Sequence, residues 1–422
     1  MSKTDIIRKL LKDNIVLATG CTEPVAVALC VAKAKKILGK QPQRIELFIS
    51  QNIIKNAMGV GIPGTGMKGL PIAVSLGVYG DCSQGLDVLN NVSQHLDKAK
   101  EWLNTHEINI QLAKNVDKLY IECIAYSGND FSKAIIANTH QNFIHLQRNE
   151  EIFLHIDNFN NQTKESTNSI EESEISSKDV FDYATQSDIS EISWLMDTIK
   201  VIEKATQEGI EGVFGLNLGK ILFSDEESSV RKRVIARTCA ASDARMDGAT
   251  SAVYSNSGSG NQGITCTIPI YEFGKELGKS EEEINRALML SHLMSIYIKQ
   301  HIGRLSALCG VVNASIGVGC GFVLLQGGTY TQVCYLIKNM INTITGMICD
   351  GAKPSCALKI STGLNAAFDC STLAMRNIVV EETDGISEHD IERSINNLGK
   401  IGRYGMDCTD NLILEIMTNK EK

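Results

Sequence analysis

The chain has 422 residues, a formal net charge of −8 at pH 7 and a pI near 5.6. Binding to nucleic acid or to an anionic membrane depends on positive charge, so this balance argues against both kinds of partner. The sequence contains no apolar run long enough to span a membrane and no signal-peptide cleavage pattern. We therefore expect a cytoplasmic protein.

The chain contains 13 cysteines. An odd number argues against a closed set of disulfides, and thiols in the cytoplasm are kept reduced. We therefore expect these residues to be core side chains, metal ligands or catalytic groups.

The first half of the chain mixes helices and strands. Apolar side chains recur at helical spacing over residues 5–18, and residues 25–38 are rich in Ala and Val, which predicts a buried helix. Alternating apolar residues predict strands at 44–50, 118–125 and 143–147.

A change in composition marks a boundary near the middle of the chain. Residues 157–190 are dominated by polar side chains and have few apolar anchors, so they cannot bury enough surface to offset the entropy of ordering. We expect an exposed insertion or linker there, between an N-terminal α/β portion at 1–156 and a mainly helical portion at 191–422.

The second half is predicted to be helical. A capping box opens at Ser280, and small-residue apolar segments at 305–325, 331–349 and 356–375 predict buried helices separated by glycine turns. His292 lies on an apolar helical stretch and is expected to be a core or interface residue. The predicted fold class is therefore α+β, with strands in the first half and helices in the second.

Three cysteines lie in glycine-rich segments that ordinary packing does not require. Cys309 precedes Gly-Val-Val-Asn, and Cys349 and Cys356 enclose a turn that contains Gly351 and Pro354. Zinc sites usually have a close Cys-x2-Cys pair or a nearby histidine, and neither stands beside these residues. Three thiolates suit an iron–sulfur cluster that leaves one iron open to substrate. Spacing alone leaves two interpretations open, such a cluster or buried structural thiols.

Cys21 lies in the motif Gly-Cys-Thr-Glu-Pro at 20–24, where a helix is predicted to begin. Thr22 is the expected N-cap, and Pro24 fits the first turn. The positive end of the helix dipole is expected to lower the pKa of the Cys21 thiol, which favours a general base or a metal ligand. A small residue packed at a turn is the alternative.

Two glycine-rich loops, at 59–69 and 255–263, can present backbone N–H groups to an anion. Neither fits a Walker A or a dinucleotide-binding motif, and a plain connecting loop is the alternative for the second. Arg245, and Lys353 beside Cys349, are basic residues near these turns and are further candidates for anion contacts. The predicted contacts to a small polar anion are polar side chains of the second loop and one lysine of the first: Ser257, Ser259, Asn261, Gln262 and Lys68.

Together, these motifs resemble those of the iron–sulfur-dependent L-cysteine desulfidases, a family also catalogued as UPF0597 and related to the L-serine dehydratase α-chain. The resemblance extends from about residue 10 to about residue 415. The segments that carry it are Gly-Cys-Thr-Glu-Pro at 20–24, Ser-Gly-Ser-Gly-Asn-Gln-Gly at 257–263, Cys-Asp-Gly-Ala-Lys-x-x-Cys-Ala at 349–357 and Gly-Met-x-x-Thr-Asp at 405–410.

The resemblance implies a [4Fe–4S] cluster with three cysteine ligands, which carry over as Cys309, Cys349 and Cys356. Bacterial iron–sulfur serine dehydratases space the last two ligands more widely than the seven positions found here. The resemblance also implies that Cys21 removes the substrate α-proton, with ligation or protection of the cluster as the competing role. The second glycine loop and Lys68 would hold the substrate carboxylate.

The implied reaction is β-elimination of a small-molecule amino acid, L-cysteine, to hydrogen sulfide, pyruvate and ammonia. Dehydration of L-serine on the same cluster is the alternative. A pyridoxal-phosphate lyase would need a Schiff-base lysine in a phosphate-binding context, which the sequence does not offer, and a non-catalytic cysteine sensor would not need an open iron. The sequence leaves open whether the chain forms a homo-oligomer.

Overall fold

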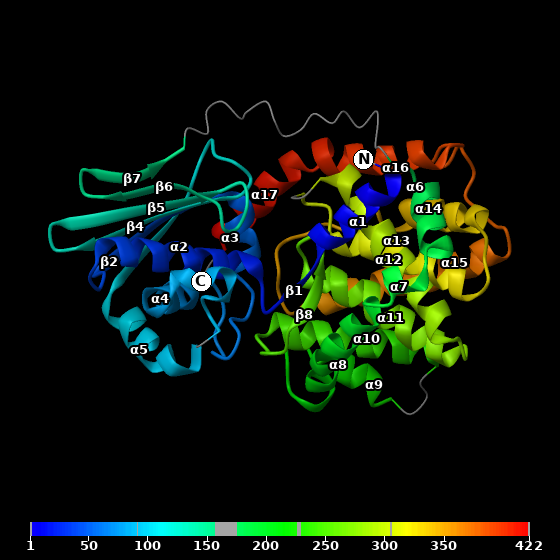
Figure 1. Cartoon of the computed structure of the whole chain (residues 1–422), viewed down its shortest axis with the longest axis horizontal. Coiled ribbons are helices and arrows are strands. Elements are labelled where there is room, and N and C mark those ends of the chain that lie inside the picture. The colour runs from blue at the N-terminus through cyan, green and yellow to red at the C-terminus, as the bar shows by residue number, and fades with distance from the viewer. Residues whose placement is uncertain (1, 91, 157–174, 226–228, 304–305, 421–422) are drawn as a thin grey trace.

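The computed structural model describes residues 2–90, 92–156, 175–225, 229–303 and 306–420, without the side chains of residues 92 and 93. Two lobes lie side by side (Figure 1), one built around a sheet and the other almost entirely of helices. Strands cluster in the first half of the chain and helices fill the second, which confirms the predicted α+β class. Across the described ranges, no helix has both the length and the apolar character needed to cross a membrane.

The N-terminal lobe is a six-stranded sheet with helices on one face (Figure 1). The strand order is β3-β2-β4-β5-β6-β7; β2 and β3 run parallel and every other neighbouring pair is antiparallel. The strands are β2 (Arg44–Ile49), β3 (Glu107–Leu112), β4 (Tyr120–Ser127), β5 (Asp130–Ala137), β6 (Phe143–Arg148) and β7 (Glu151–His155). The helices are α2 (Thr22–Leu38), α3 (Gln51–Ala57), α4 (Leu70–Tyr79), the 3₁₀ helix η1 (Cys82–Asp87) and α5 (Val92–Thr105).

The core of this lobe follows from the alternation seen in the sequence. On β2, Ile45, Leu47 and Ile49 are fully buried while their neighbours are half-buried, so one face of the strand points at the helices. Helix α2 lies across β4, β5 and β6, and α4 packs on α2. Because α2 is enclosed by strands on one side and a helix on the other, its apolar residues occupy almost its whole circumference.

The helical lobe is organised around α12 and α13, which pack against each other at its centre. Its other helices surround this pair. The helices of the lobe are α1 (Lys3–Asn14), α6 (Ser177–Gln186), α7 (Ile189–Ile192), α8 (Leu195–Glu211), α9 (Leu218–Phe223), α10 (Val230–Met246), α11 (Gly260–Glu276), α12 (Glu281–Ile302), α13 (Gly310–Leu325), α14 (Tyr330–Ile344), α15 (Cys356–Met375) and α16 (Ile391–Lys400). The capping box predicted at Ser280 is present at the start of α12.

A two-stranded ribbon ties the start of the chain to the helical lobe. Strand β1 (Ile15–Ala18) pairs antiparallel with β8 (Val253–Asn256). The prediction of helix over residues 5–18 is therefore wrong for its last four residues, because hydrogen bonds to β8 hold them extended. The ribbon places the loop that follows β8 beside the end of α1, where the N–H of Ser257 donates to the carbonyl of Asn14 at 3.0 Å.

The polar stretch expected at 157–190 falls partly outside the described residues, which resume at Ile175. From Ser177 onward the chain forms α6, whose Val180 and Ala184 are fully buried against the core of the helical lobe. The capping box at Ser176 starts this helix.

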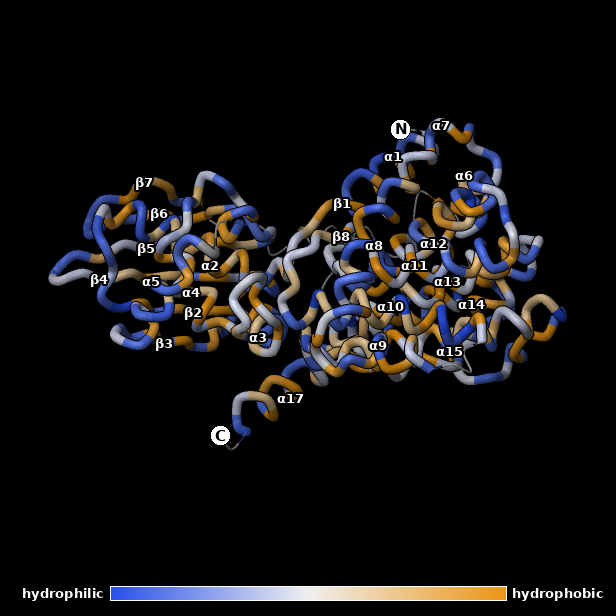
Figure 2. The backbone as a smooth tube through the Cα atoms, turned by 90° about the horizontal axis from the view of Figure 1, so that it is seen from below, coloured by the Kyte–Doolittle hydropathy of each residue, from blue (hydrophilic) through white to orange (hydrophobic). Residues whose placement is uncertain are grey.

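The C-terminal segment crosses back to the N-terminal lobe. After α16 the chain makes a π-helical turn, η3 (Ile401–Gly405), and then forms α17 (Asp407–Thr418), which contacts α3. Figure 1 shows α17 between the two lobes, and Figure 2 shows its end projecting from the body of the molecule.

Candidate active site at the junction of the lobes

Four segments far apart in the sequence bring the predicted cysteines into one region. Cys21 packs with Val60 of the first glycine loop and Met246 at the end of α10, and Cys356 packs against this group. Cys356 raises the pKa of Cys21 by its charge, and Cys349 does the same to Cys356, so the three thiols lie within electrostatic range of one another in turn. All 13 cysteines of the chain are free thiols.

A short backbone ladder places Cys309 and Cys349 side by side. Leu308 and Ile348 form an isolated antiparallel bridge. The N–H of Cys309 donates to the carbonyl of Met347 at 2.9 Å, and the N–H of Cys349 donates to the carbonyl of Ala307 at 2.6 Å. Because these bonds flank the bridge, the two thiols lie within hydrogen-bonding contact of each other.

The two thiols of this pair have opposite acidities. Contact with Cys309 lowers the pKa of Cys349 to about 5, and the positive charge of Lys55 acts in the same direction against the effect of burial. The same contact, together with burial, raises the pKa of Cys309. Burial also raises the pKa of Cys356. The pair therefore gives up its first proton readily and its second only with difficulty.

Cys21 is the N-cap of α2, one position before the predicted Thr22, and its side chain makes no cap hydrogen bond. Pro24 lies in the first turn, as predicted. The expectation that the helix end lowers the pKa of Cys21 is wrong. Burial outweighs the favourable charge of Arg245 and raises the pKa of the thiol to about 11.

Three helices begin at the candidate cysteines. Cys21 caps α2, Cys309 caps α13, and Cys356 is the first residue of α15. The N-terminus of a helix carries unpaired N–H groups and a partial positive charge. The helix ends therefore favour anions in this region, although burial raises the pKa values of Cys21 and Cys356.

The second glycine loop is a tight turn followed directly by a helix. Ser257 and Gly258 both have positive φ, of 51° and 80°, as a two-residue hairpin turn requires. The Oγ of Ser257 donates to Asn256, and Ser259 caps α11 by accepting from the N–H of Gln262. Both serines thus stabilise the turn.

Arg245 links this loop to the turn that holds Cys21. Its Nη1 donates to Oδ1 of Asn261 at 3.2 Å, and its Nη2 donates to the carbonyl of Gly20 at 2.9 Å. The guanidinium is buried, and its Nε has no hydrogen-bond partner. Gln262 accepts at Oε1 from Nδ2 of Asn313 at 2.7 Å. Asn261 and Gln262 are thereby fixed beside the cysteines.

The first glycine loop docks on the segment after α10. The N–H of Gly61 donates to the carbonyl of Met246, and the N–H of Gly64 donates to the carbonyl of Gly248. Lys68 forms a 2.6 Å ion pair with Asp247 and is half exposed. Lys68 therefore lies near the site, and its charge is paired with that of Asp247.

Sequence reasoning missed three lysines that surround the Cys309–Cys349 pair. Lys359 donates to the carbonyl of Ile348 at 2.7 Å, Lys55 is 2% exposed, and Lys299 is 7% exposed. Burial lowers the pKa of Lys299 to about 8, against the opposing effect of the two thiols. The signal that could have identified Lys55 and Lys299 is a lysine inside an apolar helical run, at 53–57 and 296–302.

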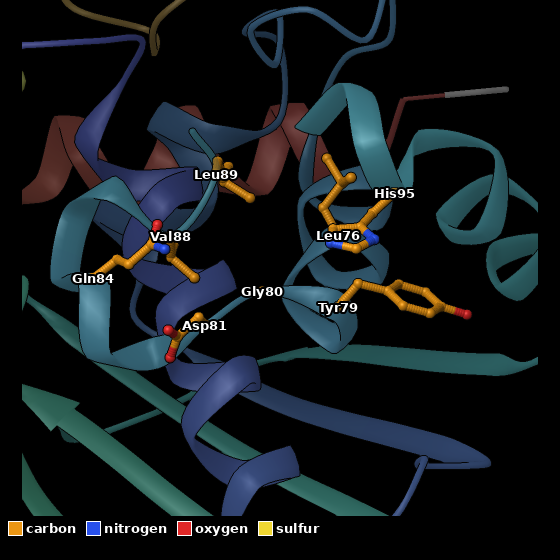
Figure 3. A pocket seen from close by; sticks show the side chains of 8 residues that line it. All are labelled: Leu76, Tyr79, Gly80, Asp81, Gln84, Val88, Leu89 and His95. Carbon is orange, nitrogen blue, oxygen red and sulfur yellow. The ribbon is translucent and has the colours of Figure 1, made fainter. Parts of the chain in front are cut away.

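Within the described ranges, no group of three or more His, Cys, Asp or Glu side chains is arranged to hold a metal ion. Figure 3 shows a cavity of about 70 Å³ between α4, η1 and α5. It is smaller than a typical ligand pocket, and none of the four candidate cysteines lines it. A larger surface hollow of about 620 Å³, beside Lys338 and His389, is lined by Cys334 but by none of the four candidate cysteines.

Comparison with known proteins gives a consistent picture over nearly the whole chain. The family described as Serine dehydratase alpha chain matches residues 83–415. A protein of Phocaeicola vulgatus is 47% identical over 98% of this chain and 97% of its own length. Relatives from Parabacteroides distasonis and Clostridium perfringens are 46% and 40% identical and are covered over 98% and 99% of their lengths, by 99% of this chain in each case. All three bear the name UPF0597 protein.

Proposed function

The chain belongs to the serine dehydratase alpha-chain family, and on this premise we propose that it is an iron–sulfur-dependent lyase. The proposed reaction is β-elimination of L-cysteine to hydrogen sulfide, pyruvate and ammonia, carried out in the reducing cytoplasm. The observation that carries the proposal is the meeting of four free thiols from three separate segments, three of them at the N-termini of helices.

The residues of the site fit a [4Fe–4S] cluster held by Cys309, Cys349 and Cys356. Each liganded iron of such a cluster takes one thiolate, so the three sulfurs need not converge on one ion. The lowered pKa of Cys349 favours the deprotonated form that ligation requires. Nearby positive charge from Lys55 and Lys359 suits an anionic group.

In the proposed mechanism the cluster, when bound, supplies an open iron that acts as a Lewis acid toward the substrate. Cys21 accepts the α-proton at Sγ, which requires its thiolate form; burial disfavours that form and the charge of Arg245 favours it. The electron pair left on the α-carbon forms the double bond as the Cβ–S bond breaks and sulfide leaves. The aminoacrylate product takes up water and gives pyruvate and ammonia. Ligation or protection of the cluster is the competing role for Cys21.

The substrate carboxylate is proposed to bind at the start of α11 and near the first glycine loop. Asn261 uses its amide oxygen for Arg245, which leaves its NH₂ group as the proposed donor. Ser257, the N-cap Ser259 and Gln262 shape the same turn, and Lys68 would contribute charge by leaving Asp247.

L-Serine is the second candidate substrate, because the family description names serine dehydration. The same elimination would then expel hydroxide in place of hydrosulfide. The two substrates differ only in the leaving group, so kcat/KM for each decides between them.

Anaerobic reconstitution with iron and sulfide tests the proposal. We expect about four irons per chain, a broad visible absorption that bleaches in air, and sulfide with pyruvate from L-cysteine. Serine substitution of Cys309, Cys349 or Cys356 should lower the iron content, and Cys21→Ser should retain iron but form no product. Asn261→Ala should raise KM for L-cysteine about tenfold. Lys68→Ala should raise it as well.

Matched controls are available on the same helices. Cys320 lies on α13 with Cys309, and Cys370 lies on α15 with Cys356. Their serine variants should bind iron as the wild type does. A protein that turns over cysteine without iron would refute the cluster, and a Cys21→Ser protein depleted of iron would make Cys21 a ligand.

A further inference from the structure

The motif at the C-terminal end of the family resemblance has no role in the mechanism above, yet it reaches the thiol site. Asp410 of α17 forms an ion pair with Lys55 of α3. The side chain of Lys55 is 1% exposed and that of Asp410 is 12% exposed. An ion pair buried to this degree is costly to break from one side, because the remaining charge is left without compensation.

The backbone of Lys55 is pressed against the turn between Cys349 and Cys356. Gly351 has a φ of +96°, and a Cβ built on it would lie 2.1 Å from the carbonyl oxygen of Lys55 and 3.4 Å from its Cγ. Any side chain at position 351 would therefore collide with α3. This contact between backbones fixes the position of Lys55 relative to the turn that begins at Cys349.

The C-terminal segment that carries Asp410 is also held on the helical lobe. Arg403 in the π-helical turn donates to the carbonyl of His301 at 2.7 Å, at the end of α12. Lys299 lies one turn or less before that end, and the charges of Lys55 and Lys299 act on each other. The C-terminal segment thus contacts the end of the helix that carries Lys299 and, through Asp410, the side chain of Lys55.

We propose that Lys55, held in place by Asp410, is a positioning residue for the cluster: it supplies buried positive charge beside Cys349 and makes α17 part of the site. The inference rests on the proposed cluster. Positive charge at this place offsets the negative charge of thiolate ligands and stabilises a reduced cluster relative to an oxidised one. The ion pair with Asp410 keeps the ammonium from turning toward solvent.

The test compares reconstituted wild type with the double variant Lys55→Met/Asp410→Leu. Replacing both charges avoids an unpaired buried ion, so the fold is retained. We expect the cluster of the double variant to be lost to a chelator about tenfold faster, as for other residues that support metal ligands. We also expect its reduction potential to be lower than that of the wild type. Lys55→Arg, which keeps the positive charge and its partner Asp410, should lie between the wild type and the double variant in both properties.

The matched control is Asp407→Asn on the same helix. Asp407 pairs with Lys118 at 3.7 Å, and both side chains are about half exposed. This variant should keep the wild-type potential and rate of cluster loss. A double variant indistinguishable from the wild type in both measurements would overturn the inference and leave the proposed function intact. A wild-type protein that takes up no iron would overturn both.

Discussion

At the scale of single residues, burial and neighbouring groups together decide the acidity of each thiol. Cys21 and Cys349 both lie at the candidate site, yet burial raises the pKa of one to about 11 while a partner thiol lowers that of the other to about 5. The difference lies in their neighbours, since only Cys349 has a second thiol in hydrogen-bonding contact. The sequence around Cys21 does not show that Arg245 lies nearby, and the sequence around Cys349 does not show that Cys309 does.

His292 gives a prediction on pH dependence. It is fully buried on α12, where Nδ1 accepts from Asn256 at 3.2 Å and Nε2 lies 2.9 Å from Oγ1 of Thr267. Burial lowers its pKa to about 3. Above pH 6.5 the ring is neutral in both states, so the stability is fully present. Below pH 6.5 the unfolded chain takes up a proton that the folded chain does not, and stability is lost as the pH falls toward 3.

This residue alone should lower the free energy of unfolding by about 2 kcal/mol between pH 7 and pH 5. Urea unfolding at the two pH values measures it, and the loss should be absent in His292→Gln. His389, whose side chain is 89% exposed, provides the control, since His389→Gln should keep the wild-type loss. Equal losses in wild type and His292→Gln would show that His292 is protonated or solvated in the folded protein.

The candidate residues were predictable from sequence only where a local motif marked them. Cys309, Cys349, Cys356 and Cys21 stand in unusual glycine-rich segments, and the structure brings these segments together. The Lys55–Asp410 pair joins residues 355 positions apart. No periodicity or motif connects such a pair, because only the tertiary fold makes them neighbours.

At the scale of elements, the start of α11 depends on a close approach to β8. A Cβ at Gly263 would lie 1.7 Å from the carbonyl oxygen of Tyr254. Backbone atoms at that distance cannot yield as a flexible side chain would. The glycine is therefore what lets the helix that carries Asn261 and Gln262 lie against the ribbon.

Gly263→Ala should lower the free energy of unfolding by about 3 kcal/mol, because the helix must move away from the strand. Chemical denaturation measures the loss. Gly346→Ala is the matched control, since a Cβ there meets no atom within 4 Å and the residue is exposed. That control should leave stability unchanged within about 0.5 kcal/mol. An unchanged Gly263→Ala protein would mean that α11 is not seated on β8 as described.

Elements with long periodic patterns were predicted well, and short ones were not. The buried helix expected at 25–38 is α2, and the strand expected at 44–50 is β2. β1 and β8 have four residues each, too few for a strand period to stand out, and β1 continues the apolar spacing of α1. Their pairing depends on residues more than 200 positions apart, which local sequence does not encode.

At the scale of the whole molecule, α17 is the element by which the end of the chain reaches the first lobe. Leu414 is 4% exposed and belongs to the core of the N-terminal lobe, although it follows the entire helical lobe in sequence. Removing its side chain leaves a cavity in that core, which should cost about 2–5 kcal/mol. The N-terminal lobe should then unfold at lower denaturant concentration than the helical lobe.

Two probes separate the lobes in Leu414→Ala. Trp102 is buried in the N-terminal lobe, so its fluorescence in a Trp194→Phe background reports that lobe, while far-UV circular dichroism is dominated by the helical lobe. We expect coincident transitions in the wild type and an earlier fluorescence transition in Leu414→Ala. Leu412→Ala, on the exposed face of the same helix, should behave as the wild type. If Leu414→Ala shifted both signals together, the two lobes would be a single cooperative unit, because damage to one core would then be felt equally in the other.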